Sequence, residues 1–391
     1  MLGACIRAPA ACRSGAGATG QTPRAASVHC LGGQPRVKAE DAAARPANPQ
    51  GITDSMEWCA SSQLARKRMM ARLKVVITAR SFGRYSRAAY AILERAGCHV
   101  SHLSGSRPKT AEEMIPLVRD ADGLIVGCDE ISAAVLDVAP RLKVVAKFGV
   151  GYDNIDVRAA GERGISVTFT PGATEDTVAD LAMGLVVALA RQITTGDAMV
   201  RAGGWERPRS VGLCHRTLGI VGLGAIGRRL AARARVFGMR LVAHDVVPDV
   251  AFARQYEIRY TTLEDLLQEA DFVSLHVPLT PGSRKLIGER ELQLMKRTAF
   301  LVNTARGELV DEEALVCALR EGTIAGAGLD VFWNEPPLGS PLLALSNVIL
   351  TPHIAGDSPE ASESKGATSA QDVVRVLQGL APLHPVPIKS V

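Results

Sequence analysis

The sequence has no hydrophobic run long enough to cross a membrane. Its longest apolar stretch, residues 181–190, is well short of the roughly 20 residues that a membrane helix needs, and it suits a buried helix better. The eight cysteines include no CxxC pair and no Cys/His cluster, and four of them fall in the first 59 residues. We therefore expect no metal site, no disulfide framework and a reducing, cytoplasmic compartment.

Excess positive charge is confined to the start of the chain. Residues 1–69 hold nine Lys and Arg against four Asp and Glu, whereas residues 70–391 hold 36 of each. A neutral globular part argues against a nucleic-acid surface, so we expect neither nucleic acid nor a membrane as partner. The 391 residues, 47% of them hydrophobic, suffice for two or three domains with sizeable cores.

The first 70 residues have no hydrophobic period and are rich in Ala, Gly, Arg and Pro. We expect this extension to be disordered. It lacks the apolar centre of a secretory signal, while the absence of Asp and Glu before residue 40 loosely resembles an organellar transit peptide. Our preferred hypothesis is that this composition comes from a GC-rich upstream frame, translated from a start codon placed too early. The working polypeptide would then begin at Met69 or Met70.

Residues 217–245 have the order strand, glycine-rich turn, helix, strand and acidic residue. The apolar run at 218–221 predicts a buried strand, the pattern over 228–237 predicts a helix, and 241–243 predicts a second strand that ends at Asp245. A glycine motif alone often marks only a turn. Here every neighbouring segment is the one that a dinucleotide-binding unit requires.

The glycine motif itself is Gly222-x-Gly224-x-x-Gly227. Gly222 permits the tight turn, Gly224 lets the backbone approach a pyrophosphate, and Gly227 lets the helix pack closely on the strand. The helix N-terminus offers N–H groups to the phosphates. Asp245 can accept hydrogen bonds from an adenosine ribose and would repel a 2′-phosphate. Since no Arg or Lys lies between Asp245 and Ala253, the sequence predicts NAD rather than NADP.

Strand and helix signals alternate on both sides of this unit. The alternation predicts βαβ units and parallel sheets, with ligands beyond the carboxyl ends of the strands. A long helix over Thr174–Arg191, with Thr174 as its N-cap, should link the two regions. The other predicted strands are 73–78, 98–102, 123–126, 143–147, 272–275, 299–302, 325–331 and 348–350, and the other predicted helices are 85–95, 111–118, 131–138, 263–268 and 312–320.

Two loops in the first region are candidate anion sites. The glycines of the loop 148–156 expose backbone N–H groups that could hold a carboxylate, with a plain tight turn as an equal alternative. Arg107, in the loop after the second predicted strand, could pair with an anionic substrate. We favour a solvated surface arginine there.

Three chemically complementary residues follow predicted strands of the second region. Arg306 can bind an anionic 2-oxo acid and polarise its carbonyl. His353 can exchange a proton with the C2 oxygen, because its ordinary pKa is near neutral. Glu335 can orient the imidazole and raise its pKa. Each residue has a structural alternative, but their common position at the predicted cofactor edge favours a catalytic site.

These residues and motifs resemble the NAD-dependent D-isomer-specific 2-hydroxyacid dehydrogenases over roughly residues 72–384. Within that family, the loop 147–156 and the segment 171–185 look most like D-3-phosphoglycerate dehydrogenases. The specific motifs are GLGAIG with Asp245, HVPLT at 276–280, NTARG at 303–307, GLDVFWNEPP at 328–337 and TPHIAG at 351–356.

The resemblance implies two Rossmann-like domains, with a nucleotide-binding domain inserted into a flavodoxin-like substrate domain. The substrate domain would consist of residues 71–168 and 353–384, and the NAD-binding domain of residues 169–352. The region 174–191 would contribute to a homodimer. Many relatives carry a longer side chain at Ala225, which could slightly weaken phosphate contacts here. We expect no regulatory amino-acid-binding domain, and hence no serine feedback through one.

The resemblance also implies the site residues. The catalytic set would be Arg306, Glu335 and His353, and the substrate carboxylate would bind at Val150, Gly151 and Arg306. The implied NAD contacts are Gly222, Gly224, Ala225, Ile226, Gly227, Asp245, His276, Val277, Pro278, Thr304, Ala305, Asp330 and Thr177.

The sequence thus predicts hydride transfer between nicotinamide and C2 of a small D-2-hydroxy acid, with 3-phospho-D-glycerate of serine biosynthesis as favoured substrate. A glyoxylate or hydroxypyruvate reductase is the nearest alternative. A third hypothesis is an NAD-sensing binding protein that resembles transcriptional corepressors of this family. The complete Arg, Glu and His set favours turnover over binding alone.

Overall fold

The computed structural model describes residues 73–387, which fall within one compact unit, Met56–Val391. The expectations for residues 1–70, including a start at Met69 or Met70, lie outside the described residues. Within the described part of the chain, no single helix has the length and apolar composition of a membrane span. Helices α6 (Glu175–Arg191) and α7 (Ile193–Arg201) reach that length only as a pair, and they are bent by 61° where they meet.

The first part of the chain forms a five-stranded parallel sheet. Its strand order, β2-β1-β3-β4-β5, is that of flavodoxin-like folds. Strands β3 and β4 are buried along their whole length, which explains why they read as continuous apolar runs. The elements are β1 (Lys74–Ile77), α2 (Ala88–Arg95), β2 (His99–His102), α3 (Ala111–Val118), β3 (Gly123–Val126), α4 (Ala133–Asp137), β4 (Val144–Lys147), α5 (Val157–Glu162) and β5 (Ser166–Thr168).

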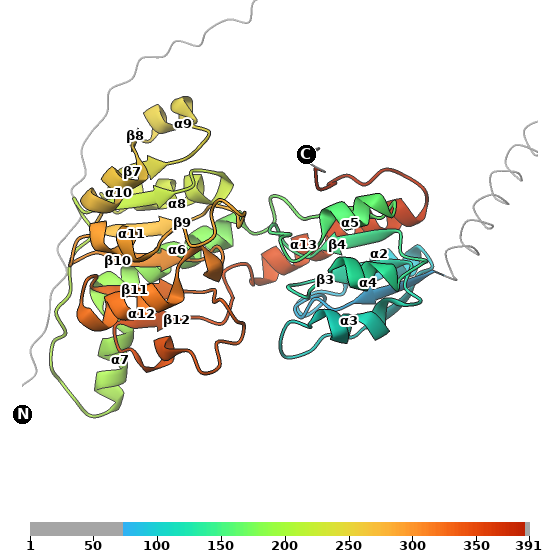
Figure 1. Ribbon diagram of the computed structural model, residues 1–391, viewed down its shortest axis with the longest axis horizontal. Helices are drawn as coiled ribbons and strands as arrows, with labels where there is room; N and C mark the ends of the chain where they lie inside the picture. Colours follow the sequence, from blue (N-terminus) through green and yellow to red (C-terminus); the bar gives the residue numbers. More distant parts are fainter. Residues whose placement is uncertain (1–72, 388–391) are drawn as a thin grey trace, which may run out of the picture. The chain divides into compact units, whose positions relative to one another are not determined.

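The last helix of the chain, α13 (Pro359–Leu377), returns to this first sheet. Figure 1 shows α13 beside β3 and β4, and its contacts with α2 are also extensive. Val373 and Leu377 share one hydrophobic core with Val75 and Val144. The first sheet is therefore covered by helices that come before and after the second sheet in the sequence.

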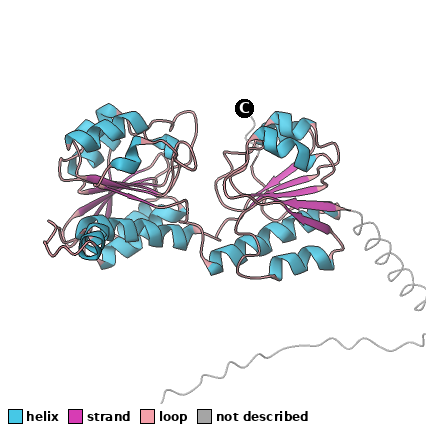
Figure 2. Ribbon diagram, turned by 90° about the horizontal axis from the view of Figure 1, so that it is seen from below, coloured by secondary structure: helices cyan, strands magenta, loops and turns pink. Residues whose placement is uncertain are grey.

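The middle of the chain forms a seven-stranded parallel sheet of order β12-β11-β10-β9-β6-β7-β8. The strand order reverses between β6 and β9, which is where open sheets of this kind bind dinucleotides. Helices cover both faces of each sheet (Figure 2). The strands are β6 (Thr217–Val221), β7 (Arg240–His244), β8 (Ile258–Tyr260), β9 (Phe272–Leu275), β10 (Phe300–Asn303), β11 (Gly326–Leu329) and β12 (Val348–Leu350).

Besides α6 and α7, the helices of this second part are α8 (Ala225–Val236), α9 (Val250–Gln255), α10 (Leu263–Glu269), α11 (Glu289–Leu294) and α12 (Glu312–Glu321), with short 3-10 turns at Gly307–Leu309 and Pro341–Ala344. The predicted α/β class with two Rossmann-like units is confirmed.

Several element bounds differ from the predictions by one to three residues. Helix α8 begins at Ala225, three residues earlier than predicted, because Gly224 already ends the turn. Thr174 is the N-cap residue of α6, as predicted, but its hydroxyl accepts no N–H group of the helix. The Glu175 carboxylate accepts from the amides of Gly172 at 2.7 Å and Thr174 at 3.0 Å, both of which precede the helix.

The core position of Leu377 gives a test of the returning helix. The side chain of Leu377 is 3% exposed and lies in the core that it shares with Val75 and Val144, whereas Leu380, just beyond α13, is 50% exposed. Leu377→Ala should lower the free energy of unfolding by about 2–5 kcal/mol, since it leaves a cavity. The control Leu380→Ala should change it by less than about 0.5 kcal/mol. Urea unfolding of the full chain measures both, and equal effects would contradict this packing.

Candidate active site

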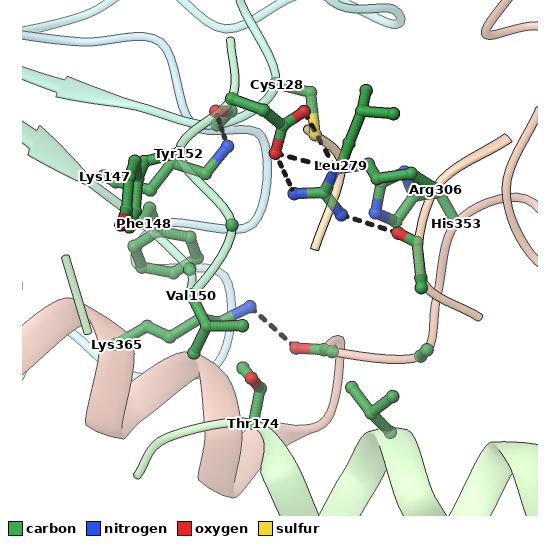
Figure 3. A pocket seen from close by; sticks show the side chains of 18 of the residues that line it. Cys128, Lys147, Phe148, Val150, Tyr152, Thr174, Leu279, Arg306, His353 and Lys365 are labelled. Atoms are coloured by element: carbon green, nitrogen blue, oxygen red, sulfur yellow. Dashed lines mark hydrogen bonds and ion pairs between the residues drawn. The ribbon is translucent and has the colours of Figure 1, made fainter. Parts of the chain in front are cut away.

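Strand ends from both sheets line one cleft of about 920 Å³ (Figure 3). Strands β1, β3 and β4 contribute their following loops, and so do β9, β10 and β12. These are carboxyl ends of parallel strands, where the sequence predicted the site. The predicted site residues on the cleft wall are Val150, Gly151, Ile226, His276, Val277, Pro278, Thr304, Ala305, Arg306 and His353.

The imidazole of His353 and the carboxylate of Glu335 are in hydrogen-bond contact. Nδ1 of His353 lies 2.7 Å from Oε2 of Glu335, whose other oxygen accepts from the Phe332 amide at 3.3 Å. Burial lowers the pKa of His353, but the hydrogen bond to Glu335 and nearby negative charge outweigh burial, so the pKa lies above its ordinary 6.5. The pair thus holds a proton-exchanging imidazole in one orientation, with Nε2 free for a ligand.

His353 is held in place by a buried carboxylate that the sequence assigned to the cofactor. His353 has φ of +55°, a left-handed conformation that costs energy outside glycine. The Asp330 carboxylate, fully buried, accepts from Thr351 Oγ1 at 2.6 Å and from the amides of Ile354 and Ala355, both at 2.9 Å. Asp330 therefore fixes the turn that carries His353. Its predicted contact with nicotinamide stays a prediction.

Arg306 extends across the cleft to the loop that follows β4. Its Nε lies 2.9 Å from Oδ1 of Asp153, and its Nη1 donates to the Ala305 carbonyl at 2.7 Å. The loop after β10 is itself braced by Asn303, whose amide side chain donates to the Arg306 carbonyl at 2.7 Å. Burial lowers the pKa of Arg306, but the Asp153 charge outweighs it and the pKa is raised. The guanidinium thus stays charged, with N–H groups left for a ligand.

The glycine at position 151 is required by this arginine. A Cβ there would lie 1.8 Å from Nη2 of Arg306. The amides of Val150 and Gly151 have no hydrogen-bond partner among residues 73–387. Two backbone donors and a guanidinium therefore face the same part of the cleft, which suits a carboxylate.

The glycine-rich turn has the geometry that its spacing predicted. Gly222 has φ of +95°, which is disfavoured for other residues. A Cβ on Gly227 would lie 2.2 Å from the carbonyl oxygen of Gly222, so only glycine permits this close packing. Nothing lies within 4 Å of a Cβ built on Gly224, which leaves room for a ligand at the N-terminus of α8.

Asp245 lies at the end of β7, next to this turn. Its Oδ2 accepts from the Leu223 amide at 2.7 Å and its Oδ1 from the Val247 amide at 2.9 Å. The carboxylate is thereby fixed beside the glycine-rich turn, as expected of a ribose acceptor. Ala225 is the first residue of α8. Thr177, predicted as a cofactor contact, donates its hydroxyl to the Thr174 carbonyl at 2.8 Å.

Three residues that line the cleft have a buried polar atom without a partner among the described residues: Oγ1 of Thr174, Oγ1 of Thr304 and Nδ1 of His276. Nε2 of His276 lies 2.9 Å from Oγ of Ser274. Burial lowers the pKa of His276 to about 4, so this ring is neutral at pH 7. His276 and Thr304 were predicted cofactor contacts, and a buried polar atom without a protein partner can be satisfied by a ligand group or an ordered water.

Arg107 is a surface arginine, as the favoured interpretation expected. Its Nη2 lies 2.7 Å from Oε1 of Glu113 in the first turn of α3. Arg107 does not line the cleft.

The cleft residues that were not singled out from the sequence include four with chemically active side chains near the predicted site: Asp153, Cys128, Lys147 and Lys365. Loss of hydration raises the pKa of Cys128, but the charges of Lys147, His353 and Arg306 more than compensate, so the pKa is lowered. Asp153 and Lys147 lie within the quoted motif of residues 147–156, which was the available signal. No sequence signal marked Cys128 or Lys365.

Known proteins are similar to this chain in sequence and in fold. The family model described as "D-isomer specific 2-hydroxyacid dehydrogenase, NAD binding domain" matches residues 183–355. A glyoxylate reductase of Korarchaeum cryptofilum is 46% identical over 283 residues, which are 70% of this chain and 85% of that protein. The chain belongs to the D-isomer specific 2-hydroxyacid dehydrogenase family. It is an NAD-dependent oxidoreductase acting on CH–OH donors, which confirms the predicted enzyme class and cofactor.

Other relatives of this dehydrogenase differ in name and length. A D-3-phosphoglycerate dehydrogenase of Methanocaldococcus jannaschii is 44% identical over 275 residues, which are 69% of this chain but 52% of that protein. The crystal structure of the TT0316 protein from Thermus thermophilus matches with a TM-score of 0.74 and 42% identity, covering 81% of this chain and all of that one. The family is thus established, but its substrates vary.

NAD fits the described residues of the dehydrogenase. The open space at Gly224, the carboxylate of Asp245 and the unpaired atoms of His276 and Thr304 match a pyrophosphate, a ribose and a polar ring substituent. When bound, NAD supplies the hydride acceptor or donor of the reaction.

Asp245 should determine the choice between NAD and NADP. We predict that Asp245→Ser lowers the ratio of kcat/KM for NADH over NADPH at least about tenfold, because the carboxylate repels a 2′-phosphate. The control is Asp249→Ser, since Asp249 also accepts a backbone N–H, from Phe252 at 3.1 Å. Steady-state kinetics with both cofactors measures the ratio. An unchanged ratio in Asp245→Ser would remove this role.

Proposed function

We propose that this dehydrogenase interconverts a D-2-hydroxy acid carrying a second anionic group with its 2-oxo acid, and that 3-phospho-D-glycerate is its favoured substrate. The supporting observation is the charge of the cleft. Its basic side chains are Arg80, Arg84, Lys147, Arg158, Arg306 and Lys365, against the acidic Asp129, Asp153 and Asp357.

This positive balance is local, because residues 70–391 as a whole are neutral. A cleft lined by one sign of charge concentrates ligands of the other sign. A substrate with a single carboxylate interacts with few of these positive charges, whereas a phosphorylated acid carries more negative charge and interacts with more of them. The charge of the cleft therefore favours a polyanionic substrate.

At the reacting end, we assign carboxylate binding to Arg306 and to the amides of Val150 and Gly151. Arg306 is held by Asp153 and remains charged. Its planar group can contact both the carboxylate and the C2 oxygen of a 2-oxo acid. Polarising that oxygen makes C2 more electrophilic for hydride transfer.

We assign proton transfer to His353. In the reductive direction the protonated imidazole gives its Nε2 proton to the C2 oxygen, and in the oxidative direction the neutral ring takes that proton back. Glu335 accepts from Nδ1 and stabilises the charged ring. The raised pKa keeps the proton-donating form populated toward higher pH.

A second candidate function is reduction of glyoxylate or hydroxypyruvate. Several relatives named glyoxylate reductase are 42–46% identical, and the chain covers 84–86% of their length. The relative named D-3-phosphoglycerate dehydrogenase is covered over 52% of its length. Whole-length likeness thus favours the smaller substrates, while the charge of the cleft favours the phosphorylated one.

We also propose that the enzyme forms a homodimer. Apolar side chains that follow α6 along the chain are exposed: Ile193 at 53%, Val200 at 55% and Trp205 at 84%. Such exposed apolar groups suit a protein contact.

A substrate panel tests the proposal. We expect kcat/KM for 3-phosphohydroxypyruvate to exceed that for hydroxypyruvate at least about tenfold with NADH, because the two acids differ only in the phosphoryl group and one added charge contact is worth about that factor. The oxidation of 3-phosphoglycerate should be measurable at alkaline pH. Equal or better turnover of hydroxypyruvate and glyoxylate would overturn the assignment in favour of the second candidate.

A further inference from the structure

Two buried ammonium groups in the cleft have only neutral hydrogen-bond partners. Lys147 is 4% exposed and Lys365 is 5% exposed. Nζ of Lys147 donates to the Gly127 carbonyl at 2.6 Å and to Oδ1 of Asn154 at 2.8 Å, and Nζ of Lys365 donates to the Gly356 carbonyl at 2.7 Å. Among residues 73–387, neither lysine has a carboxylate within 4.0 Å.

Buried charges without a counter-ion are unusual, because desolvation of an ion is costly unless an opposite charge compensates. The ring of Phe148, 4.5 Å from Nζ of Lys365, compensates only in part. Burial lowers the pKa of Lys365 to about 8, with Asp357 opposing the shift and Lys147 adding to it. Lys365 is thus still mainly charged at pH 7, and its charge is available to an anion.

A hydroxyl group near Lys365 also lacks a partner. Thr174 is 4% exposed, lines the cleft, and its Oγ1 has no hydrogen-bond partner within the described range. Gly356 lies between the two side chains, since a Cβ built on it would be 3.4 Å from Cγ2 of Thr174 and 4.0 Å from Nζ of Lys365. Figure 3 shows Lys365 and Thr174 on the same side of the cleft, away from Arg306.

We infer that Lys365 and Thr174 form a second anion subsite that binds the distal phosphoryl group of the substrate. This subsite lies on the other side of the cleft from the Arg306 guanidinium (Figure 3), and its assignment rests on the proposed function. The Lys365 ammonium supplies a compact positive charge and the Thr174 hydroxyl supplies a further donor to phosphoryl oxygens. Bound phosphate would place a negative charge within hydrogen-bond distance of Lys365, where no carboxylate of the described residues lies.

Lys365 also has a structural contact that the test must separate from ligand binding. Its bond to the Gly356 carbonyl braces the turn that carries His353. A bracing role alone would affect every substrate equally, since His353 serves all of them. A binding role would affect phosphorylated substrates most.

The decisive experiment compares Lys365→Met with the wild-type full chain on 3-phosphohydroxypyruvate and hydroxypyruvate. We expect kcat/KM for the phosphorylated acid to fall roughly 10- to 100-fold more than that for hydroxypyruvate, the size of a charge-assisted contact. The loss should appear chiefly in KM. Lys365→Arg should retain more of the preference, and Lys143→Met, at an exposed lysine, should leave both substrates unaffected.

Inorganic phosphate as an inhibitor separates this inference from the proposed function. If wild type does not prefer the phosphorylated acid, the substrate assignment fails. The subsite is still supported in that case if inorganic phosphate inhibits hydroxypyruvate reduction and Lys365→Met relieves the inhibition. If both substrates lose equally in Lys365→Met and phosphate inhibition persists, Lys365 is a bracing residue and the subsite is refuted. Thermal unfolding of each variant shows whether it is folded. If Lys365→Met does not fold, the same comparison of kcat/KM for the two substrates is made with Lys365→Arg and Thr174→Val.

Discussion

The catalytic geometry depends on one buried carboxylate, Asp330. It lies beneath the turn after β12 and accepts hydrogen bonds from Thr351, Ile354 and Ala355. These bonds hold His353 in a left-handed conformation that the backbone would otherwise leave. The imidazole then meets Glu335, which comes from the loop after β11. A fully buried acid thus determines where a cleft-facing imidazole lies, although no periodic pattern in the sequence indicates that role.

The charged groups of the cleft fall into two classes. Arg306 has its own counter-ion in Asp153, so its position is set by the protein and the ligand meets a group already in place. Lys147 and Lys365 donate only to neutral acceptors. Burial lowers the pKa of both lysines, and Lys365, with a pKa of about 8, keeps a charge that a ligand can meet. Under the proposed function, Arg306 belongs to the reaction centre that all 2-hydroxy acid substrates share, and Lys365 contributes to the choice among those substrates.

Much of the fold could be predicted because its elements are apolar and regular. Helix α3 and strands β9 and β12 have the predicted bounds, and the glycine motif identified the cofactor end of the second sheet. The strands β5 and β8 and the helix α9 were not predicted. The two strands have three residues each and mix polar with apolar side chains, whereas the equally short β12 consists of three apolar residues, and α9 has only six residues. Asp153 and Arg306 are 153 positions apart, and Lys365 sits within a polar stretch of α13, so only the folded chain brings them to the cleft.

The most direct test is the titration of His353 in the full-length enzyme, followed by ¹⁵N NMR of labelled histidines and assigned with His353→Gln. Because Glu335 stabilises the protonated ring, the pKa should lie above 6.5, and Glu335→Gln should lower it. Reduction, which needs the protonated ring, should then decline at lower pH in Glu335→Gln than in wild type. A His353 pKa at or below 6.5 in the folded enzyme, unchanged by Glu335→Gln, would contradict the proposed acid–base pair.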